Sequence, residues 1–487
     1  MYSKSVRTRF APSPTGYMHV GNLRTALYEY LIAKSSNGAF IIRIEDTDQQ
    51  RQVEGAVELI FSTLRKVGLH HDEGPDIGGL YGPYVQSQRL DLYPGFARRL
   101  VDSGHAYRCF CDKDRLDQLH QEAESENYAA SGYDRHCRDL SSGEIDEQLA
   151  SGKSYVIRQK MPLDGTTSFT DAVFGKITVD NSELEDQVLL KSDGFPTYNF
   201  ANVIDDHAMN ITHVVRGSEY LSSTPKYNLL YDAFGWEKPE YVHLPLIVGE
   251  DGRKLSKRHG AVSFSDLVEQ GFLPEAIINY LALLGWCPKD NRELYTLEQL
   301  CDAFSVDRIS KSPSVFDYQK LEWFNGEYIR NMTTDEFLSI CEPWLQQVFG
   351  TLPPAASLLA EMLQPRVTRL SNIPGMISFL AAHQQAEIDL YTNKKSKSTL
   401  DSTKKVLPAV IEKLSTLTQW DRDRIHEALI SLAKDMEMKN GQVMWPVRIA
   451  VSGQSVTPGG AIEILLLLGQ DESVSRLRKV YDFLSDR

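Results

Sequence analysis

The sequence lacks the features that mark a secreted or membrane protein. No stretch approaches the roughly 18 uninterrupted apolar residues of a membrane-spanning helix, and residues 1–10 contain no apolar core of a leader peptide. Cysteine is scarce, with 6 among 487 residues, and three of them crowd between Cys109 and Cys137. That pattern does not suit the disulfide framework of a small secreted domain. We therefore expect a cytoplasmic protein in a reducing compartment, without membrane association.

Basic residues are also in short supply, since 52 Lys and Arg stand against 66 Asp and Glu. The formal net charge of −14 argues against indiscriminate binding to nucleic acid, although local basic patches on an acidic body still allow it. Residues 361–450 reverse the sign, with 13 Lys or Arg against 10 Asp or Glu. The length and the 42% hydrophobic content predict three to five packed units.

The start of the chain alternates between strand and helix patterns. A short strand at residues 8–10 leads into a Pro- and Gly-containing loop, and apolar residues from Leu23 to Leu31 then recur at helical spacing. Residues 39–44 predict a buried strand, and residues 53–64 predict a second helix. This β-α-β-α order predicts an α/β fold with a doubly wound, Rossmann-like parallel sheet, which binds ligands beyond the carboxyl ends of its strands.

The pattern changes further along the chain. Short strands, acidic loops and turn signals from Cys109 to about Glu185 suggest an inserted α+β domain, and residues 188–190 resume the strand pattern. From about residue 270 onward nearly every apolar run is helical, which predicts an all-α C-terminal region.

Residues 12–22 (PSPTGYMHVGN) connect the first strand to a helix N-terminus. Such a turn presents backbone donors and the positive end of a helix dipole to phosphate. His19 is a candidate donor to the charge that develops on a phosphoryl group, and Gly21 lets a nucleotide approach the backbone. Taken alone, the segment is equally well explained as an ordinary turn with a capping histidine.

A second loop, Lys254-Leu255-Ser256-Lys257-Arg258, lies between Gly252 and Gly260. Three cations in a glycine-flanked loop suit a clamp on a triphosphate, because a cation on the leaving pyrophosphate stabilises the transition state. A solvated basic loop is the more ordinary interpretation when this segment is considered by itself.

Together the two loops resemble the His-Ile-Gly-His-like and Lys-Met-Ser-Lys-Ser-like signatures of class I aminoacyl-tRNA synthetases, with Asn22 in place of the second His. Five segments resemble the bacterial glutamyl branch in order: residues 9–16, 43–48, 84–89, 189–206 and 254–258. The resemblance spans essentially the whole chain. It implies activation of L-glutamate with Mg²⁺ and ATP to glutamyl-adenylate, followed by transfer to the 3′-terminal adenosine of tRNA(Glu). His19 and Lys257 are then the catalytic residues, and the implied ATP contacts are His19, Gly21, Lys254, Ser256 and Lys257.

Charge supports glutamate as the substrate, because an unpaired carboxylate in a buried pocket is costly and needs cations. Arg9 and Arg216 are the candidate cations. The resemblance assigns both to the acidic end of the substrate and Glu45 to its ammonium group. It implies further glutamate contacts at Ala11, Ser13, Tyr198 and Asn202. Alternatively, Tyr198 and Asn202 are polar core residues whose hydrogen bonds are satisfied within the protein.

Other functions fit the sequence less well. Glutaminyl relatives are expected to have Pro-Glu-Pro-Asn in the first loop and an uncharged residue at position 216, where this chain has Pro-Ser-Pro-Thr and arginine. A small-molecule nucleotidylyltransferase, or a short paralogue that glutamylates a tRNA base, would not need the long helical C-terminus. A non-enzymatic tRNA-binding protein gives no reason to combine His19, Glu45 and Lys257.

Cys109-x-Cys111 and Tyr133-x-x-x-Cys137 form a third constellation. Three thiols and a phenol suit a tetrahedral structural zinc site that would stabilise an insertion poor in core residues, with His136 as the substitute ligand. The alternative is that these are plain free cysteines.

The resemblance also places tRNA contacts. It assigns anticodon reading to Arg366, Thr457 and Pro458, and a further tRNA contact to Arg51. The implied units are residues 1–108 and 187–252 for the two halves of the catalytic fold, 109–186 for the acceptor-binding insertion, 253–335 for a stem-contact region and 336–487 for the anticodon-binding region. We expect a monomer. The sequence leaves open whether activation requires tRNA and whether glutamine tRNA is also charged.

Overall fold

A computed structural model describes residues 5–48, 51–125, 133–256, 258, 260 and 262–486. The chain divides into two compact units, one of residues 1–268 with 274–318, the other of residues 269–273 with 319–487. No helix in the described ranges combines the length and the apolar character needed to cross a membrane.

The main sheet of the first unit is built from parallel strands. β1 (Arg7–Phe10) pairs with β2 (Ala39–Ile42), and β8 (His213–Gly217) pairs with β9 (Glu240–Leu244). A backbone hydrogen bond of 3.0 Å from Thr212 to β1 sets β1 beside β8. The predicted doubly wound parallel sheet is therefore confirmed, and its strand ends lie where a ligand is expected.

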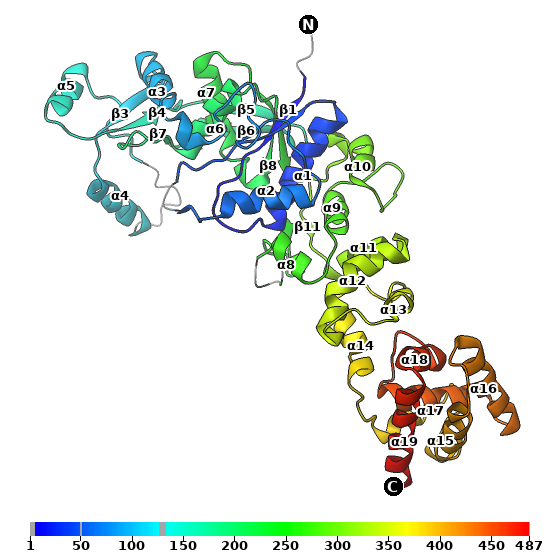
Figure 1. The fold of residues 1–487 in the computed structure, drawn as a ribbon. Helices are drawn as coiled ribbons and strands as arrows, with labels where there is room; N and C mark the ends of the chain where they lie inside the picture. Colours follow the sequence, from blue (N-terminus) through cyan, green and yellow to red (C-terminus); the bar gives the residue numbers. More distant parts are fainter. Residues whose placement is uncertain are drawn as a thin grey trace. The chain divides into compact units, whose positions relative to one another are not determined.

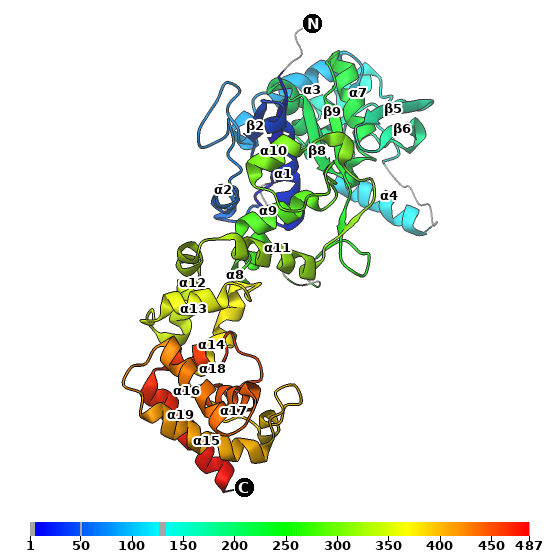
Figure 2. The same ribbon diagram turned by 90° about the vertical axis from the view of Figure 1, so that its right-hand side faces the viewer.

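Strands of the predicted insertion are shared between two sheets. β5 (Thr166–Asp171) extends the main sheet in parallel beside β9, and β6 (Gly175–Asp180) closes that edge as an antiparallel strand (Figure 2). β3 (Ala106–Cys109), β4 (Val156–Gln159) and β7 (Val188–Leu190) form a separate antiparallel sheet. The five-part division of the chain stays a prediction, but the main sheet reaches into residues assigned to the insertion.

Helix α1 (Val20–Ser35) follows the first loop, as its apolar spacing predicts. Leu23, Ala26, Leu27 and Leu31 are all 0% exposed, so one face of the helix is fully buried against the sheet. This burial fixes the helix N-terminus, and with it the loop that precedes the helix.

The remaining elements of this unit cover the sheets or continue them. They are α2 (Ala56–Lys66), α3 (Tyr93–Asp102), α4 (Lys113–Ser125), α5 (Ser142–Ala150), α6 (Tyr198–Ala208), α7 (Thr224–Phe234), β10 (Ile247–Val248), α8 (Phe264–Glu269), α9 (Pro274–Leu283), α10 (Leu297–Ala303) and β11 (Ser314–Val315).

The second unit is helical in its described residues, as predicted (Figure 1). Its helices are α11 (Tyr318–Asn331), α12 (Thr334–Phe349), α13 (Ala356–Leu363), α14 (Ile373–Ala381), α15 (Leu400–Ser415), α16 (Arg422–Asp435), α17 (Asn440–Ser452), α18 (Ala461–Leu468) and α19 (Gln470–Ser485). Val406, Leu407, Val410 and Leu414 of α15 recur at helical spacing and form part of one apolar core with the later helices.

Candidate functional site

A cavity of about 300 Å³ lies at the carboxyl ends of β1 and β8. Parallel sheets bind their ligands at this edge. The structure brings most of the predicted site residues to its wall: Arg9, Ala11, Ser13, His19, Gly21, Glu45, Tyr198, Arg216 and Lys254. Residues that lie more than 240 positions apart in the sequence therefore share one pocket.

Two of the predicted residues that the structure describes, Ser256 and Asn202, do not line the cavity. Ser256 is half-buried, and Lys257 lies outside the described residues. Asn202 lies one turn after Tyr198 on α6 and is 3% exposed, and its Nδ2 has no hydrogen-bond partner among the described residues.

The two signature loops meet at the N-terminus of α1. His19 caps this helix, because its Nδ1 accepts the Gly21 N–H over 3.0 Å. The next residue, Val20, donates its N–H to the carbonyl of Val262, just beyond the second loop, over 2.9 Å. Lys254 lies at the start of the second loop and also reaches the cavity. Backbone bonds thus hold both loops at one site.

His19 is held as a neutral ring. Burial lowers its pKa below the ordinary value of 6.5, and the nearby charge of Lys254 lowers it further. Since Nδ1 accepts a hydrogen bond, the single ring proton of the neutral form belongs on Nε2. His19 therefore caps the helix through Nδ1, and its ring also forms a hydrogen bond with the backbone of Leu255 in the second loop.

Arg9 lies in an acidic environment. Its Nε is 2.9 Å from Asp206 and its Nη1 is 3.2 Å from Glu29, all three side chains being almost fully buried. Arg43 joins the same network through Asp206 at 2.8 Å and Glu45 at 2.9 Å. The positive charge of Arg9 is thus largely balanced within the protein.

The pKa values of Asp206 and Glu45, two carboxylates of this network, are shifted in opposite directions. Burial alone would raise the pKa of Asp206, but Arg9 and Arg43 outweigh it and hold that pKa below its ordinary value. At Glu45, burial prevails over the same two arginines and raises the pKa. Glu45 is therefore a carboxylate that gains from an added cation, as a ligand ammonium group would supply.

Arg216 has a different environment. It is 6% exposed, its Nε donates to His243 Nε2 over 3.1 Å, and its Nη2 donates to Thr224 Oγ1 over 2.7 Å. The Tyr227 ring lies 4.7 Å from its guanidinium carbon. None of the carboxylates in the described part of the chain lies within 4.0 Å of it. The cavity therefore contains a buried cation whose contacts are all neutral.

Sequence reasoning missed the groups that hold these arginines. Arg43 and Asp206 lie within segments that carry the family resemblance, but the sequence predicted no function for either residue. Glu29 had a signal as well, because an acid on a helix with a wide buried face needs a partner. Asp171 and His243 gave no periodic or spacing signal.

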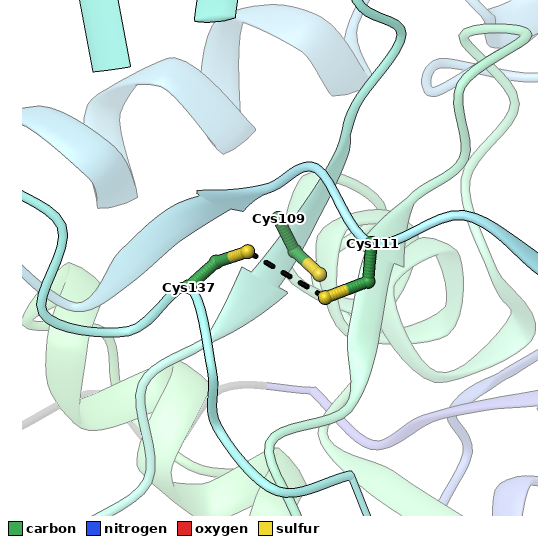
Figure 3. A group of neighbouring side chains, drawn as sticks. All are labelled: Cys109, Cys111 and Cys137. Atoms are coloured by element: carbon green, nitrogen blue, oxygen red, sulfur yellow. Dashed lines mark hydrogen bonds between the residues drawn. The ribbon is translucent and has the colours of Figure 1, made fainter. Parts of the chain in front are cut away.

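Three cysteine thiols converge in the smaller sheet region (Figure 3). The sulfur atoms of Cys109, Cys111 and Cys137 all lie within 4.8 Å of one another, with Cys111 and Cys137 3.6 Å apart. The Tyr133 hydroxyl lies 3.3 Å from the first and 3.5 Å from the second of these sulfurs. His136, the substitute ligand, is exposed and does not belong to the group.

The spacing of these atoms fits a tetrahedral metal. Zinc–sulfur bonds of about 2.3 Å place tetrahedral ligand sulfurs about 3.8 Å apart, close to the 3.6 Å between Cys111 and Cys137. A disulfide would need about 2 Å, and all six cysteines are free. The donor set of three thiols and one phenol therefore fits zinc.

In the helical unit, the predicted anticodon residues come close together. Arg366 is exposed just after α13, and its Nη1 donates to the carbonyl of Met362 over 2.8 Å. Gly459 packs so tightly on Met362 that an added Cβ would lie 2.2 Å from the methionine methyl group. Thr457 and Pro458 precede this glycine and are both buried, so their side chains offer little surface. Arg366 is the group best placed to reach a ligand.

Arg51, the other predicted tRNA contact, lies on the surface of the first unit. Its side chain is 79% exposed and forms an ion pair of 3.4 Å with Asp48. An exposed pair of this kind leaves the guanidinium available to a phosphate.

Comparisons with known proteins agree along the whole chain. Residues 5–323 match the family of class I tRNA synthetases (E and Q), catalytic domain, and residues 320–481 match an anticodon binding domain. The glutamate–tRNA ligases of Clostridium botulinum (strain Eklund 17B / Type B) and Clostridium tetani are 55% and 53% identical, over 99% and 98% of this chain and 100% and 98% of their own lengths. A crystal structure of a glutamate tRNA ligase from Elizabethkingia meningosepticum, in complex with its amino acid, superposes with a TM-score of 0.91 at 36% identity over 99% of this chain and 100% of that one.

Proposed function

The chain belongs to the class I tRNA synthetases of the glutamate and glutamine type, and from this premise we propose how its cavity selects and activates an amino acid. Its activity is that of a glutamate–tRNA ligase. The glutaminyl and nucleotidylyltransferase alternatives are not favoured.

One observation carries the assignment of the substrate pocket. Arg216 is a buried cation on the cavity wall with neutral contacts only, whereas Arg9 beside it already has two carboxylate partners. A buried charge without a counter-ion is costly, so this position is most stable when an anion occupies the cavity. The side-chain carboxylate of glutamate supplies that anion, and a guanidinium binds it with two parallel hydrogen bonds.

The remaining cavity residues orient the rest of the substrate. Glu45 takes the α-ammonium group, because its carboxylate gains from an added cation. Arg9, held by Asp206 and Glu29, lies on the wall as a second guanidinium for the acidic end. Ala11, Ser13, Tyr198 and Asn202 supply the further contacts that the family resemblance implies.

Activation proceeds by in-line attack. An oxygen of the glutamate α-carboxylate forms a bond to the α-phosphorus of ATP, and the bond from that phosphorus to the bridging oxygen breaks, so that pyrophosphate leaves with the electron pair. Mg²⁺ enters with ATP as part of the substrate. His19 Nε2–H, Lys254 and Lys257 stabilise the developing negative charge. The terminal ribose hydroxyl of tRNA then attacks the acyl carbon and AMP departs.

Isotope exchange between pyrophosphate and ATP tests this function directly. The exchange should require glutamate and should not be supported by glutamine, and it should be measured with and without tRNA. Exchange with glutamine at the rate seen with glutamate would overturn the assignment of the pocket.

The other proposals extend beyond the pocket. Zinc held by Cys109, Cys111, Cys137 and Tyr133 would stabilise the insertion and would take no part in the chemistry. Arg366 reads the anticodon, and Arg51 contacts the tRNA backbone. We also propose that the protein is a monomer, acts in the cytoplasm and is divided into the five predicted units.

A further inference from the structure

The side chain that holds Arg216 is a histidine with a carboxylate behind it. Arg216 and His243 are register partners on the adjacent strands β8 and β9, and Arg216 Nε donates to His243 Nε2 over 3.1 Å. On the other side of the ring, Nδ1 lies 2.6 Å from Oδ2 of Asp171, the last residue of β5. The His243 and Asp171 side chains are both 0% exposed.

The hydrogen bonds of Asp171 decide which nitrogen of His243 carries the ring proton. Asp171 accepts the backbone N–H groups of Val173, Phe174 and His243 over 2.9, 2.8 and 3.1 Å. Because this carboxylate acts only as an acceptor, the ring proton of His243 belongs on Nδ1. The Nε2 lone pair is then free to accept from Arg216, which can only donate. The imidazole that contacts the guanidinium is therefore neutral.

We propose that Asp171 and His243 are positioning residues for glutamate recognition, which orient the guanidinium of Arg216 without neutralising its charge. The inference rests on the proposed role of Arg216 in binding the substrate carboxylate. Carboxylates in direct contact would hold an arginine as firmly, but they would balance its charge, as Asp206 and Glu29 do at Arg9. A neutral imidazole supplies the hydrogen bond alone.

Thr224 completes the support with a second neutral acceptor. Its hydroxyl oxygen accepts Arg216 Nη2–H over 2.7 Å, and the hydroxyl group donates to the Tyr220 carbonyl over 2.8 Å, with His243 Nε2 also 3.2 Å away. Two of the donors of Arg216 are thus used on one side by neutral groups. The other N–H groups of Arg216 can bind a ligand, and the positive charge of its guanidinium is not neutralised. This charge favours the carboxylate of glutamate over the neutral amide of glutamine.

Asp171→Asn is the sharpest test, because it changes one buried atom and does not touch the cavity. The amide oxygen should remain on the N–H groups of Val173 and Phe174, since turning it away would face two donors with an NH₂ group. The amide NH₂ would then donate to His243 Nδ1 and move the ring proton to Nε2, against Arg216, and it would leave the backbone N–H of His243 without its acceptor. We expect kcat/KM for glutamate to fall roughly 10- to 100-fold, with a raised glutamate KM, an unchanged ATP KM and a lower glutamate-to-glutamine ratio.

Two substitutions at His243 separate positioning from folding. His243→Gln keeps an amide oxygen where Nε2 accepts from Arg216, whereas His243→Phe keeps the ring shape and removes the acceptor. His213→Phe is the matched control, because His213 lies on the same strand as Arg216, contacts Thr212 and Glu240, and does not line the cavity. Gln at 243 should retain much more glutamate selectivity than Phe, and the control should resemble the parent protein.

Arg216→Ala measured beside them separates this inference from the proposed function. If Arg216→Ala leaves the glutamate-to-glutamine ratio unchanged, the role of Arg216 is wrong. If that ratio collapses while Asp171→Asn and His243→Phe leave it intact, only the positioning role is wrong. Equal losses for His243→Gln and His243→Phe, or a raised ATP KM in Asp171→Asn, would likewise overturn it. In the Arg216→Ala background, Asp171→Asn should have no additional effect on the ratio.

Discussion

Arg9 and Arg216 reach the same cavity with opposite electrostatic surroundings. Arg9 contacts Asp206 at 2.9 Å and Glu29 at 3.2 Å, and Arg216 contacts a neutral imidazole and a hydroxyl group. The two guanidiniums are therefore not equivalent as anion sites. Arg9, whose charge is balanced by carboxylates, is suited to orienting the substrate. Arg216, whose charge is not balanced, is suited to selecting a substrate by its charge.

Removal of zinc should destabilise the insertion. Cys137→Ser takes one thiolate from the donor set, so we expect less than one zinc per chain by elemental analysis and a lower Tm for this variant. Cys287→Ser is the control, because Cys287 is exposed and lies outside the sulfur group. Well below one zinc per chain in the unaltered protein, with a Tm that chelation leaves unchanged, would contradict the zinc proposal.

The activity should fall on acidification because of His19. Its pKa lies below 6.5, so the ring is neutral at pH 7 and is protonated only as the pH falls through that lowered value. Protonated Nδ1 would point a donor at the Gly21 N–H and break the helix cap. The acid limb of kcat/KM against pH should therefore lie below pH 6.5.

His19→Asn provides the control for this limb. An asparagine oxygen can still accept from Gly21 and cap α1, but it does not titrate. Its rate should be lower at pH 7, and the limb assigned to His19 should be missing. An acid limb that keeps its position in this variant would assign the titration to another group.

The sequence predicts the backbone of this site better than its electrostatics. The strand predicted at residues 8–10 and found at 7–10, the buried stripe of α1 and the parallel sheet follow from local patterns, and the Pro-rich loop marks the edge where the cavity lies. The partners of Arg9 and Arg216 do not follow, because they come from strands and helices distant in sequence. The same holds for the strand β5, which an insertion boundary drawn from composition separates from the sheet it joins.

Lys257 should act on the leaving pyrophosphate. Lys257→Ala should lower the rate constant of adenylation by much more than it weakens glutamate binding, because the charge it meets develops only in the transition state. Lys238→Ala serves as the control, since Lys238 is a surface residue paired with Asp232. Equal effects of Lys257→Ala on both quantities in single-turnover kinetics would count against this role.

Substitution of Arg366 should change tRNA recognition and leave glutamate activation unchanged. Arg366→Gln should raise the KM for tRNA or change the anticodon preference, while glutamate-dependent pyrophosphate exchange stays at its normal rate. Arg424→Gln is the comparison, because Arg424 is an exposed arginine of the same helical unit whose ion pair is with Glu427 of its own helix. Unaltered kinetics of Arg366→Gln with every glutamate and glutamine tRNA tested would refute the assignment.

Arg216 should decide between glutamate and glutamine. A guanidinium gives a carboxylate two parallel charge-assisted hydrogen bonds, whereas an amide offers one acceptor and turns its own donors toward donors. Arg216→Ala should cost glutamate about 3–5 kcal/mol in kcat/KM, as for a buried charge pair broken from one side. The kcat/KM for glutamine should fall far less, so the glutamate-to-glutamine ratio should collapse in aminoacylation assays with saturating tRNA.

Arg9 is the internal comparison. Because Asp206 and Glu29 already balance its charge, Arg9→Lys should lower both substrates more evenly. A uniform loss in Arg216→Ala, combined with a selective loss in Arg9→Lys, would reverse the two roles.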